Sequence, residues 1–160
     1  MTREVFNILQ EPVDGAYRAL VAFCSKRASE MLLVVREAQV LEATGQIAIR
    51  TIEALGAYCV YASEWPGTRL IGGRSARVYH IPVTFESIGF VSNAVNSLYA
   101  WLAPALPEDL CFLRDDGTEI LASISHEKDA YLRLSNDEYA ELLEDSCLRF
   151  LNIRRWDGDA

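Results

Sequence analysis

The spacing of apolar residues along the chain predicts four helices. Tyr17, Leu20, Val21 and Cys24 recur at i, i+3, i+4 and i+7, which predicts an amphipathic helix over residues 15–27. Three further helices are predicted. The second is marked by Leu41, Ala48, Ile52 and Leu55 and ends at Gly56, and the third covers Phe85–Leu102, between the N-cap Thr84 and Pro104. The last begins at the capping box Ser135-x-x-Glu138.

Short apolar runs between these helices predict strands. The predicted strands cover 30–37, 57–62, 76–83, 110–114, 119–125 and 130–134. The Asp-Gly step in 115–118 predicts a hairpin turn, and residues 126–129 form the next reversal, so the last three strands make an antiparallel meander. Because Pro82 cannot donate a hydrogen bond, the strand 76–83 either lies at an edge of the sheet or ends there.

The order of these elements predicts an α+β fold. We expect a mixed, largely antiparallel sheet with a C-terminal three-strand meander and about four helices packed mainly on one face. A length of 160 residues fits a single domain, 1–160, with ends frayed at 1–4 and 157–160.

The acidic charge is concentrated in one part of the chain. There are 23 acidic and 15 basic residues, a net charge of −8. Residues 108–145 hold twelve acids and three bases, a net charge of −9, which leaves eleven acids and twelve bases elsewhere. This distribution argues against nucleic acid as a partner, because phosphate binding needs a basic surface. It indicates either a charged surface that keeps the protein soluble or a site for a basic protein.

The cysteines and the length of the apolar runs favour a cytoplasmic protein. Cys24, Cys59, Cys111 and Cys147 stand far apart in apolar surroundings, so we expect reduced, buried thiols. No run is long enough to cross a membrane and the N-terminus lacks a secretory pattern. No motif calls for a cofactor.

The segment 107–131 carries the densest group of chemically capable side chains. They are Glu108, Asp109, Ser123, Ser125, His126, Glu127 and Asp129. Ser125 and His126 are neighbours on a predicted strand, so they point to opposite faces and do not form a catalytic pair. Two interpretations stay open: His126 and Asp129 hydrogen-bond the turn and fix its register, or the acids and His126 line a binding site.

Metal chemistry finds little support in the sequence. The second histidine, His80, lies on a distant strand, and there is no H-x-x-x-H or C-x-x-C spacing. A metal site would need the fold to bring His80 and His126 together with Glu64 or Glu127. We therefore assign no catalytic residue and no metal ligand, and expect His80 to be a structural hydrogen-bonding residue.

Two other segments are candidate binding sites. The loop Arg69–Arg77 places Arg69, Arg74 and Arg77 around a Gly-Gly step, which suits either a solvated loop or an anion site. Trp65 stands in the turn-like segment 63–68, where it either packs in the core or anchors a protein interface.

The blocks Pro107–Gly117 (PEDLCFLRDDG) and Ser123–Tyr131 (SISHEKDAY), with Glu64–Thr68 (EWPGT), carry a resemblance. Over residues 57–134 the chain resembles a group of stand-alone bacterial cytoplasmic proteins without an assigned function. The resemblance implies a small bacterial protein and supplies no reaction.

These observations leave three hypotheses for the function. The first is a non-enzymatic interaction module, of the inhibitor or immunity type, that uses its acidic meander against a basic protein. The second is a small-ligand binder or hydrolase-like enzyme that uses the Ser125–His126–Glu127 turn and the Arg69–Arg77 loop, and it requires one pocket that joins them. The third is a homo-oligomer formed through an edge strand.

Overall fold

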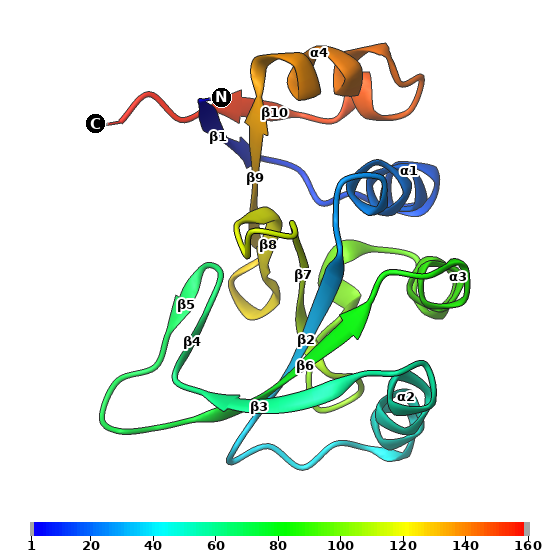
Figure 1. Ribbon diagram of the computed structural model, residues 1–160, viewed down its shortest axis with the longest axis vertical. Helices are drawn as coiled ribbons and strands as arrows, with labels where there is room; N and C mark the ends of the chain where they lie inside the picture. The colour runs from blue at the N-terminus through cyan, green and yellow to red at the C-terminus, as the bar shows by residue number, and fades with distance from the viewer. Residues whose placement is uncertain (1, 159–160) are drawn as a thin grey trace.

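The central feature of the fold is an eight-stranded sheet in the order β10-β1-β9-β8-β7-β2-β6-β3 (Figure 1). The computed structural model describes residues 2–158. The strands of this sheet are β1 (Arg3–Ile8), β2 (Glu30–Arg36), β3 (Tyr58–Ala62), β6 (Ala76–Pro82), β7 (Glu108–Leu113), β8 (Glu119–Ile124), β9 (Asp129–Ser135) and β10 (Ile153–Arg155). Every neighbouring pair is antiparallel, which confirms the α+β prediction and its C-terminal meander.

The helices cover one face of the sheet, and a small hairpin covers part of the other. The helices are α1 (Asp14–Ser25), α2 (Ala43–Ala54), α3 (Phe85–Ala94) and α4 (Asn136–Glu144). In Figure 1, α1, α2 and α3 lie on one side of the sheet, whereas the hairpin of β4 (Glu64–Trp65) and β5 (Thr68–Arg69) lies on the other.

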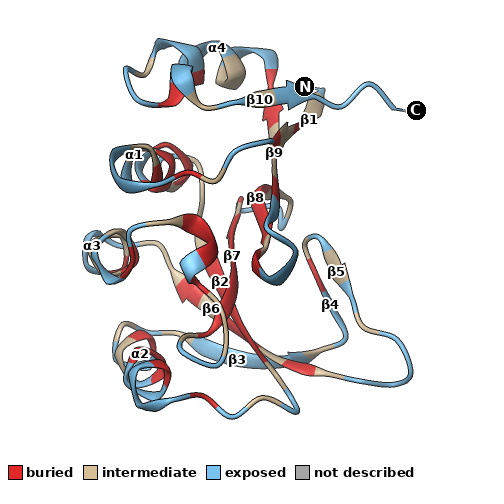
Figure 2. Cartoon of the chain, turned by 180° about the vertical axis from the view of Figure 1, so that it is seen from behind, coloured by how far each residue is buried: buried red, intermediate tan, exposed pale blue. Residues whose placement is uncertain are grey.

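Two buried apolar clusters follow from this arrangement. The larger one lies under the helices and includes Tyr17, Met31 and Phe112. The smaller one lies on the hairpin face and includes Val34 and Trp65. Alternate residues of β2 belong to the two clusters, because successive side chains of a strand point to opposite faces. Figure 2 shows β2 as a largely buried strand.

The third helix begins where the sequence predicts and ends earlier. Thr84 caps α3 in a capping box with Ser87, but the helix stops at Ala94 and not at Leu102. At Val95 the backbone is extended, and Asn96 accepts a hydrogen bond from the N–H of Asp14. Val95 and Leu98 of the predicted apolar face are still buried after α3 ends, so their spacing indicates burial and not a continued helix.

Several sequence expectations need correction. Residues 3 and 4 belong to β1 and are not frayed, while Met1 and residues 159–160 lie outside the described part of the chain. The segment 63–68, predicted as turn-like, belongs to the β4–β5 hairpin, which spans residues 64–69 around a Pro-Gly turn. β6 lies inside the sheet and ends at Pro82, the second of the two alternatives. Of the four cysteines, Cys59 and Cys147 are exposed.

Within residues 2–158, none of the helices has the length and apolar character needed to cross a membrane.

Candidate functional site

A β-bulge at the start of β7 creates the most unusual side-chain cluster of the protein. Leu32 of β2 lies opposite Cys111 and Val34 lies opposite Glu108, so β7 carries one extra residue between these two pairs. Asp109 takes up this residue with a φ of 60°, a left-handed conformation that is uncommon for an aspartate. Neighbours in a regular strand point to opposite faces, but the bulge lets Glu108 and Asp109 approach the same guanidinium.

That guanidinium belongs to Arg36, the last residue of β2. Its Nε lies 3.1 Å from Oε2 of Glu108, and its Nη2 lies 3.9 Å from Oδ2 of Asp109. Both carboxylates are almost wholly buried, whereas Arg36 is partly exposed. The guanidinium also lies 5.5 Å from the centre of the Trp65 ring, a cation–π distance. Arg36 therefore joins a buried pair of acids to the surface under the hairpin.

The carboxylate oxygens of Glu108 and Asp109 also accept hydrogen bonds from groups other than Arg36. Gln39 donates from Nε2 to Oε1 of Glu108 at 2.8 Å. The indole N–H of Trp65 donates to Oδ2 of Asp109 at 3.0 Å, and the backbone N–H of Ser125 donates to Oδ1 at 2.9 Å. Burial raises the pKa of Asp109, although these hydrogen bonds and Arg36 oppose it. The cluster thus ties β2, the hairpin, β7 and the residues after β8 together.

His126 lies at the outer side of this cluster. It belongs to a 3-10 turn over Ser125–Glu127 and its side chain is 45% exposed. Its Nδ1 lies 3.5 Å from Nη2 of Arg36 and 4.0 Å from Oε2 of Glu108. Because a guanidinium can only donate, the neutral imidazole that suits this contact has its proton on Nε2. Nε2 is then a donor on the outer side of the ring.

One open hollow connects the His126 turn with the arginine loop. It has a volume of about 230 Å³, and its lining includes Arg36, Thr68, Arg69, His126 and Glu127. A second hollow of about 490 Å³ shares Arg36 and Leu70 with the first and is also lined by Arg74. The first hollow thus joins parts of the two segments that the small-ligand hypothesis names: His126 and Glu127 of the turn, without Ser125, and Arg69 and Leu70 of the loop.

The structure brings most of the predicted binding residues together. Trp65, Glu108, Asp109 and His126 form the buried cluster and its outer edge, and Arg69 and Glu127 line the first hollow. Asp129, the first residue of β9, is exposed and takes no part in the cluster or the hollows.

The arginines of the loop separate in the fold. Arg69 pairs with Glu64 at 3.1 Å, and Arg74 lines the second hollow. Arg77 instead reaches the hydroxyl of Tyr79 at 3.1 Å, on the helix-covered face. The three guanidiniums therefore do not surround one point, because Arg77 belongs to a regular strand that turns its side chain to the helix-covered face.

Arg36 and Gln39 were not predicted as site residues. Arg36 ends β2 after five apolar residues, and its role depends on the bulge in β7, where its partner Glu108 lies 72 residues further along the chain. The one signal in the sequence is a basic residue directly after five buried positions.

The turn interpretation of His126 and Asp129 is wrong for the described residues. Neither side chain makes a hydrogen bond that closes the turn; the backbone N–H of Lys128 does so by donating to the carbonyl of Ser125 at 3.1 Å. Ser125 is buried and its hydroxyl has no hydrogen-bond partner among the described residues, whereas His126 is exposed. Both residues belong to the 3-10 turn and not to a strand, so the alternation of a strand does not account for this difference in burial.

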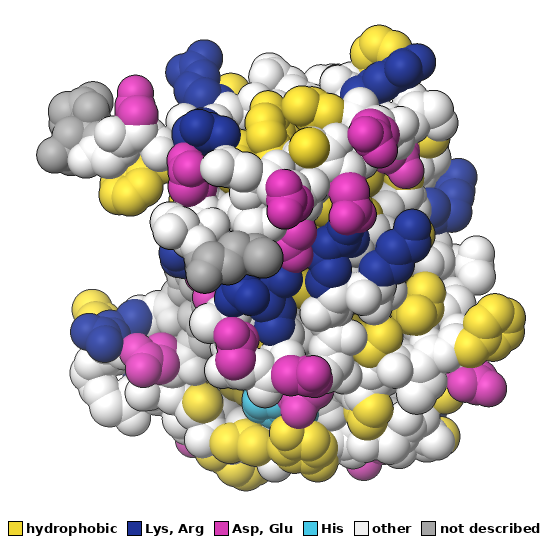
Figure 3. Space-filling model, turned by 45° about the horizontal axis from the view of Figure 1, so that its top comes forward, with side chains coloured by type: hydrophobic (Ala, Val, Ile, Leu, Met, Phe, Trp, Pro, Cys, Tyr) yellow, Lys and Arg dark blue, Asp and Glu magenta, His cyan; other side chains and the backbone are white. Residues whose placement is uncertain are grey.

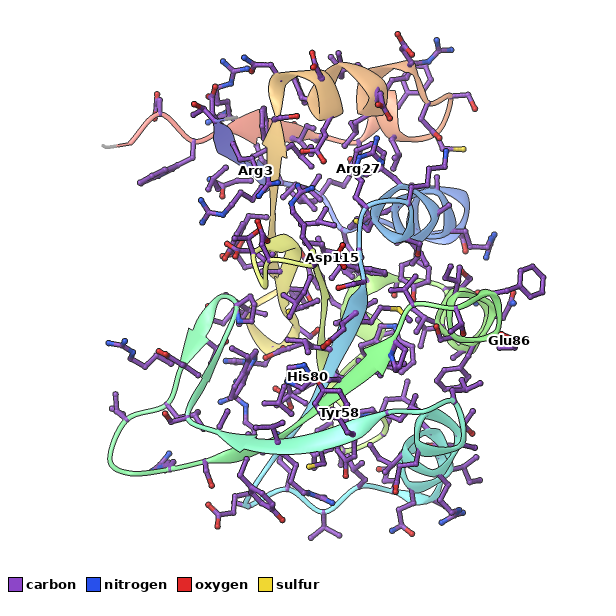
Figure 4. The ribbon with its side chains drawn as sticks, viewed as in Figure 1. Arg3, Arg27, Tyr58, His80, Glu86 and Asp115 are labelled. Atoms are coloured by element: carbon purple, nitrogen blue, oxygen red, sulfur yellow. The ribbon has the colours of Figure 1, made fainter. Side chains whose placement is uncertain are left out.

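The two histidines lie apart and have different partners. His80 makes a 2.6 Å contact from Nδ1 to Oε2 of Glu30, and its ring stacks on Tyr58 at 4.9 Å between centroids. Figure 4 shows His80 and Tyr58 side by side on β6 and β3. His80 is therefore the structural residue that the sequence suggests.

A group of possible metal ligands does exist around the other histidine. Glu108, Asp109 and His126 offer ligand atoms within 4.8 Å of one another. However, Arg36 already pairs with both carboxylates, and all four carboxylate oxygens have a hydrogen-bond or ion-pair partner within the protein. Carboxylate and imidazole groups are common metal ligands, but here the two carboxylates are already paired with Arg36.

The acidic segment is less acidic on the surface than its composition suggests. Six of its twelve acids form ion pairs with arginines: Glu108, Asp109, Asp116, Glu119, Glu138 and Glu141. Burial raises the pKa of Glu138, but hydrogen bonds from Arg114 and from the backbone of Ser135 outweigh it and leave that pKa lowered. Figure 3 shows acidic and basic side chains next to one another over the visible face.

No protein-family model, no curated protein and no solved structure matches this chain. The function is therefore argued from the chemistry of the cluster and the hollows.

Proposed function

We propose that the protein binds a small anionic ligand, a carboxylate or a phosphate monoester, in the hollow beneath the β4–β5 hairpin. One observation carries this proposal: Arg36, Arg69 and His126 line the same hollow although they come from distant parts of the chain. Guanidinium and imidazole N–H groups are the donors that recognise carboxylate and phosphate oxygens.

Arg36 is held in place before a ligand arrives. Its Nε is fixed on Glu108, and its guanidinium lies near the Trp65 ring. Its Nη1 makes no hydrogen bond to any described residue. A donor whose rotamer is already fixed loses little conformational freedom on binding, which favours affinity for a small ligand.

The second arginine of the hollow supplies a more adaptable charge. Arg69 is largely exposed and pairs with Glu64, an exposed ion pair that is weak in water. An anion in the hollow can therefore compete for this guanidinium. Glu127 in the lining and the acids that pair with Arg36 and Arg69 offset the charge of the two guanidiniums, so we expect modest affinity and a preference for small, compact anions.

A basic protein partner stays a second hypothesis. It rests on the acids that lack an arginine partner within the described chain, which are Asp115, Glu127, Asp129, Asp137, Glu144 and Asp145. Since half of the acidic segment is paired internally, the anion site has the more specific geometry. The four free cysteines support the cytoplasmic location expected from the sequence.

Calorimetric titration with inorganic phosphate and with acetate tests the anion site. We expect saturable binding by the unaltered protein, weakened about fivefold or more in Arg69→Gln and in His126→Gln, because each removes one charge-assisted or polar contact worth about 1 kcal/mol. Arg154→Gln, in the β10 edge strand, is the matched control and should leave the affinity within about twofold.

An affinity for phosphate in Arg69→Gln and His126→Gln equal to that of the Arg154→Gln control would contradict the proposal. The lack of any saturable binding by the unaltered protein would contradict it as well. Raising the salt concentration should weaken binding in the unaltered protein and the control to a similar degree, since the site is open to solvent.

A further inference from the structure

The two edges of the main sheet are built very differently. At one end, β10 has only three residues, two of which are Arg154 and Arg155. Short length and positive charge are common ways of keeping an edge strand from pairing with another chain. At the other end, β3 has five residues, Tyr-Cys-Val-Tyr-Ala, with no charge and no proline. The β3 edge therefore lacks the protection that the β10 edge has.

The apolar side chains of β3 are exposed. Tyr58 is 52% exposed, Val60 42% and Tyr61 70%, and Cys59 is also exposed. Figure 2 shows β3 as an exposed strand beside the largely buried strands β6 and β2. Within the described residues the main sheet ends at β3, so its outer backbone groups form no further ladder. Such an edge is a template for an added strand.

The sequence of β3 suits pairing with itself. In an antiparallel pair centred on Val60, the two valines face each other, Tyr58 faces Ala62 of the second copy, and Cys59 faces Tyr61 of the second copy. Each tyrosine thus faces a smaller residue, so no two tyrosine rings lie directly opposite each other. No charged residue meets a like charge, which matters for a chain with a net charge of −8.

We propose that two copies of this chain dimerise by antiparallel pairing of their β3 strands about a two-fold axis at Val60, which joins the two eight-stranded sheets edge to edge. The two interface patches are identical, as a two-fold dimer requires. None of the β3 residues lines either of the two hollows, so the dimer does not depend on anion binding.

Sedimentation over a range of protein concentrations tests the dimer. The unaltered protein should shift from monomer to dimer between about 1 µM and about 1 mM, the range expected of a small interface. Val60→Lys places two like charges opposite each other and should raise the dissociation constant at least about tenfold. Phe85→Lys is the matched control, since Phe85 is 90% exposed but lies on α3, and it should dimerise normally.

A monomer at the highest concentration would overturn the proposal and leave the edge to another protein. A dimer that persists unchanged in Val60→Lys would overturn it as well.

Cysteine cross-linking tests the register. With Cys59→Ser and Cys147→Ser in the background, Val60→Cys places two thiols across the axis, where antiparallel Cα separations of about 4.5–5.5 Å permit a disulfide. In Ala62→Cys, the thiol of one copy lies opposite position 58 of the other copy, four residues from the second thiol, so no cross-link should form. Cross-linking at position 62 but not at position 60 would refute this register.

Discussion

Replacing Arg36 by methionine would leave two buried carboxylates without their positive partner. The Nε–Oε2 distance to Glu108 is 3.1 Å, which corresponds to about 5 kcal/mol of attraction at an effective dielectric constant of about 20. Desolvation of the ion pair offsets part of this, but loss of one partner leaves the other buried and unpaired. We therefore expect the free energy of unfolding to fall by about 3–5 kcal/mol at pH 7.

The pH dependence of the Arg36→Met variant has a definite sign. Burial already raises the pKa of Asp109, and removing the guanidinium raises it further. A carboxyl group with a raised folded-state pKa favours folding at low pH and loses that contribution as the pH rises through the folded-state pKa. The stability loss in Arg36→Met should therefore be smaller near pH 4 than at pH 7.

Urea unfolding followed by tryptophan fluorescence measures this loss. The companion variants are Glu108→Gln and the double variant Arg36→Met/Glu108→Gln, which removes both charges of the pair. The double variant should recover more than half of the loss, because replacing both partners is far less costly than removing one. A loss below about 1 kcal/mol in Arg36→Met with an unchanged m-value would refute the buried ion pair as a stabilising feature.

Two further predictions follow from the hairpin and from α4. Gly67→Ala should lower the free energy of unfolding by about 1–2 kcal/mol and weaken phosphate binding, because Gly67 has a φ of 85° and an added Cβ would lie 3.2 Å from Ile124. Urea unfolding and calorimetry measure the two effects, and unchanged values would contradict the packing of the hairpin. Because the pKa of Glu138 is lowered, its contribution to the free energy of unfolding is present above about pH 5 and is lost as the pH falls through the lowered pKa. The stability of Glu138→Gln should therefore decline less between about pH 5 and 3 than that of the unaltered protein, and parallel declines would contradict the role of the ion pair with Arg114.

The sequence predicts those parts of the fold that depend on local chemistry. The capping box of Ser135 and Glu138 and the N-cap Thr84 appear where their sequence signals lie, because a cap involves residues three positions apart. The Asp-Gly turn between β7 and β8 is local in the same way.

Features that depend on distant residues could not be predicted in this way. β1 and β10 pair with each other although they come from the two ends of the chain, and no local pattern distinguishes them from frayed ends. α3 ends early because the residues after it bond to the segment that precedes α1. The candidate site shows the same limit: His126 and Glu108 could be found from their sequence block, but Arg36 joins them only through the bulge at Asp109.

The most direct test of the central claim is a nuclear magnetic resonance titration of the arginine Nε–Hε groups and the histidine ring protons with inorganic phosphate. We predict saturable shifts with one shared dissociation constant at Arg36, Arg69 and His126, and no comparable shift at Arg154 or His80, which lie outside the hollow. Equal shifts at all arginines, or no shift at Arg36 and Arg69, would contradict an anion site beneath the β4–β5 hairpin.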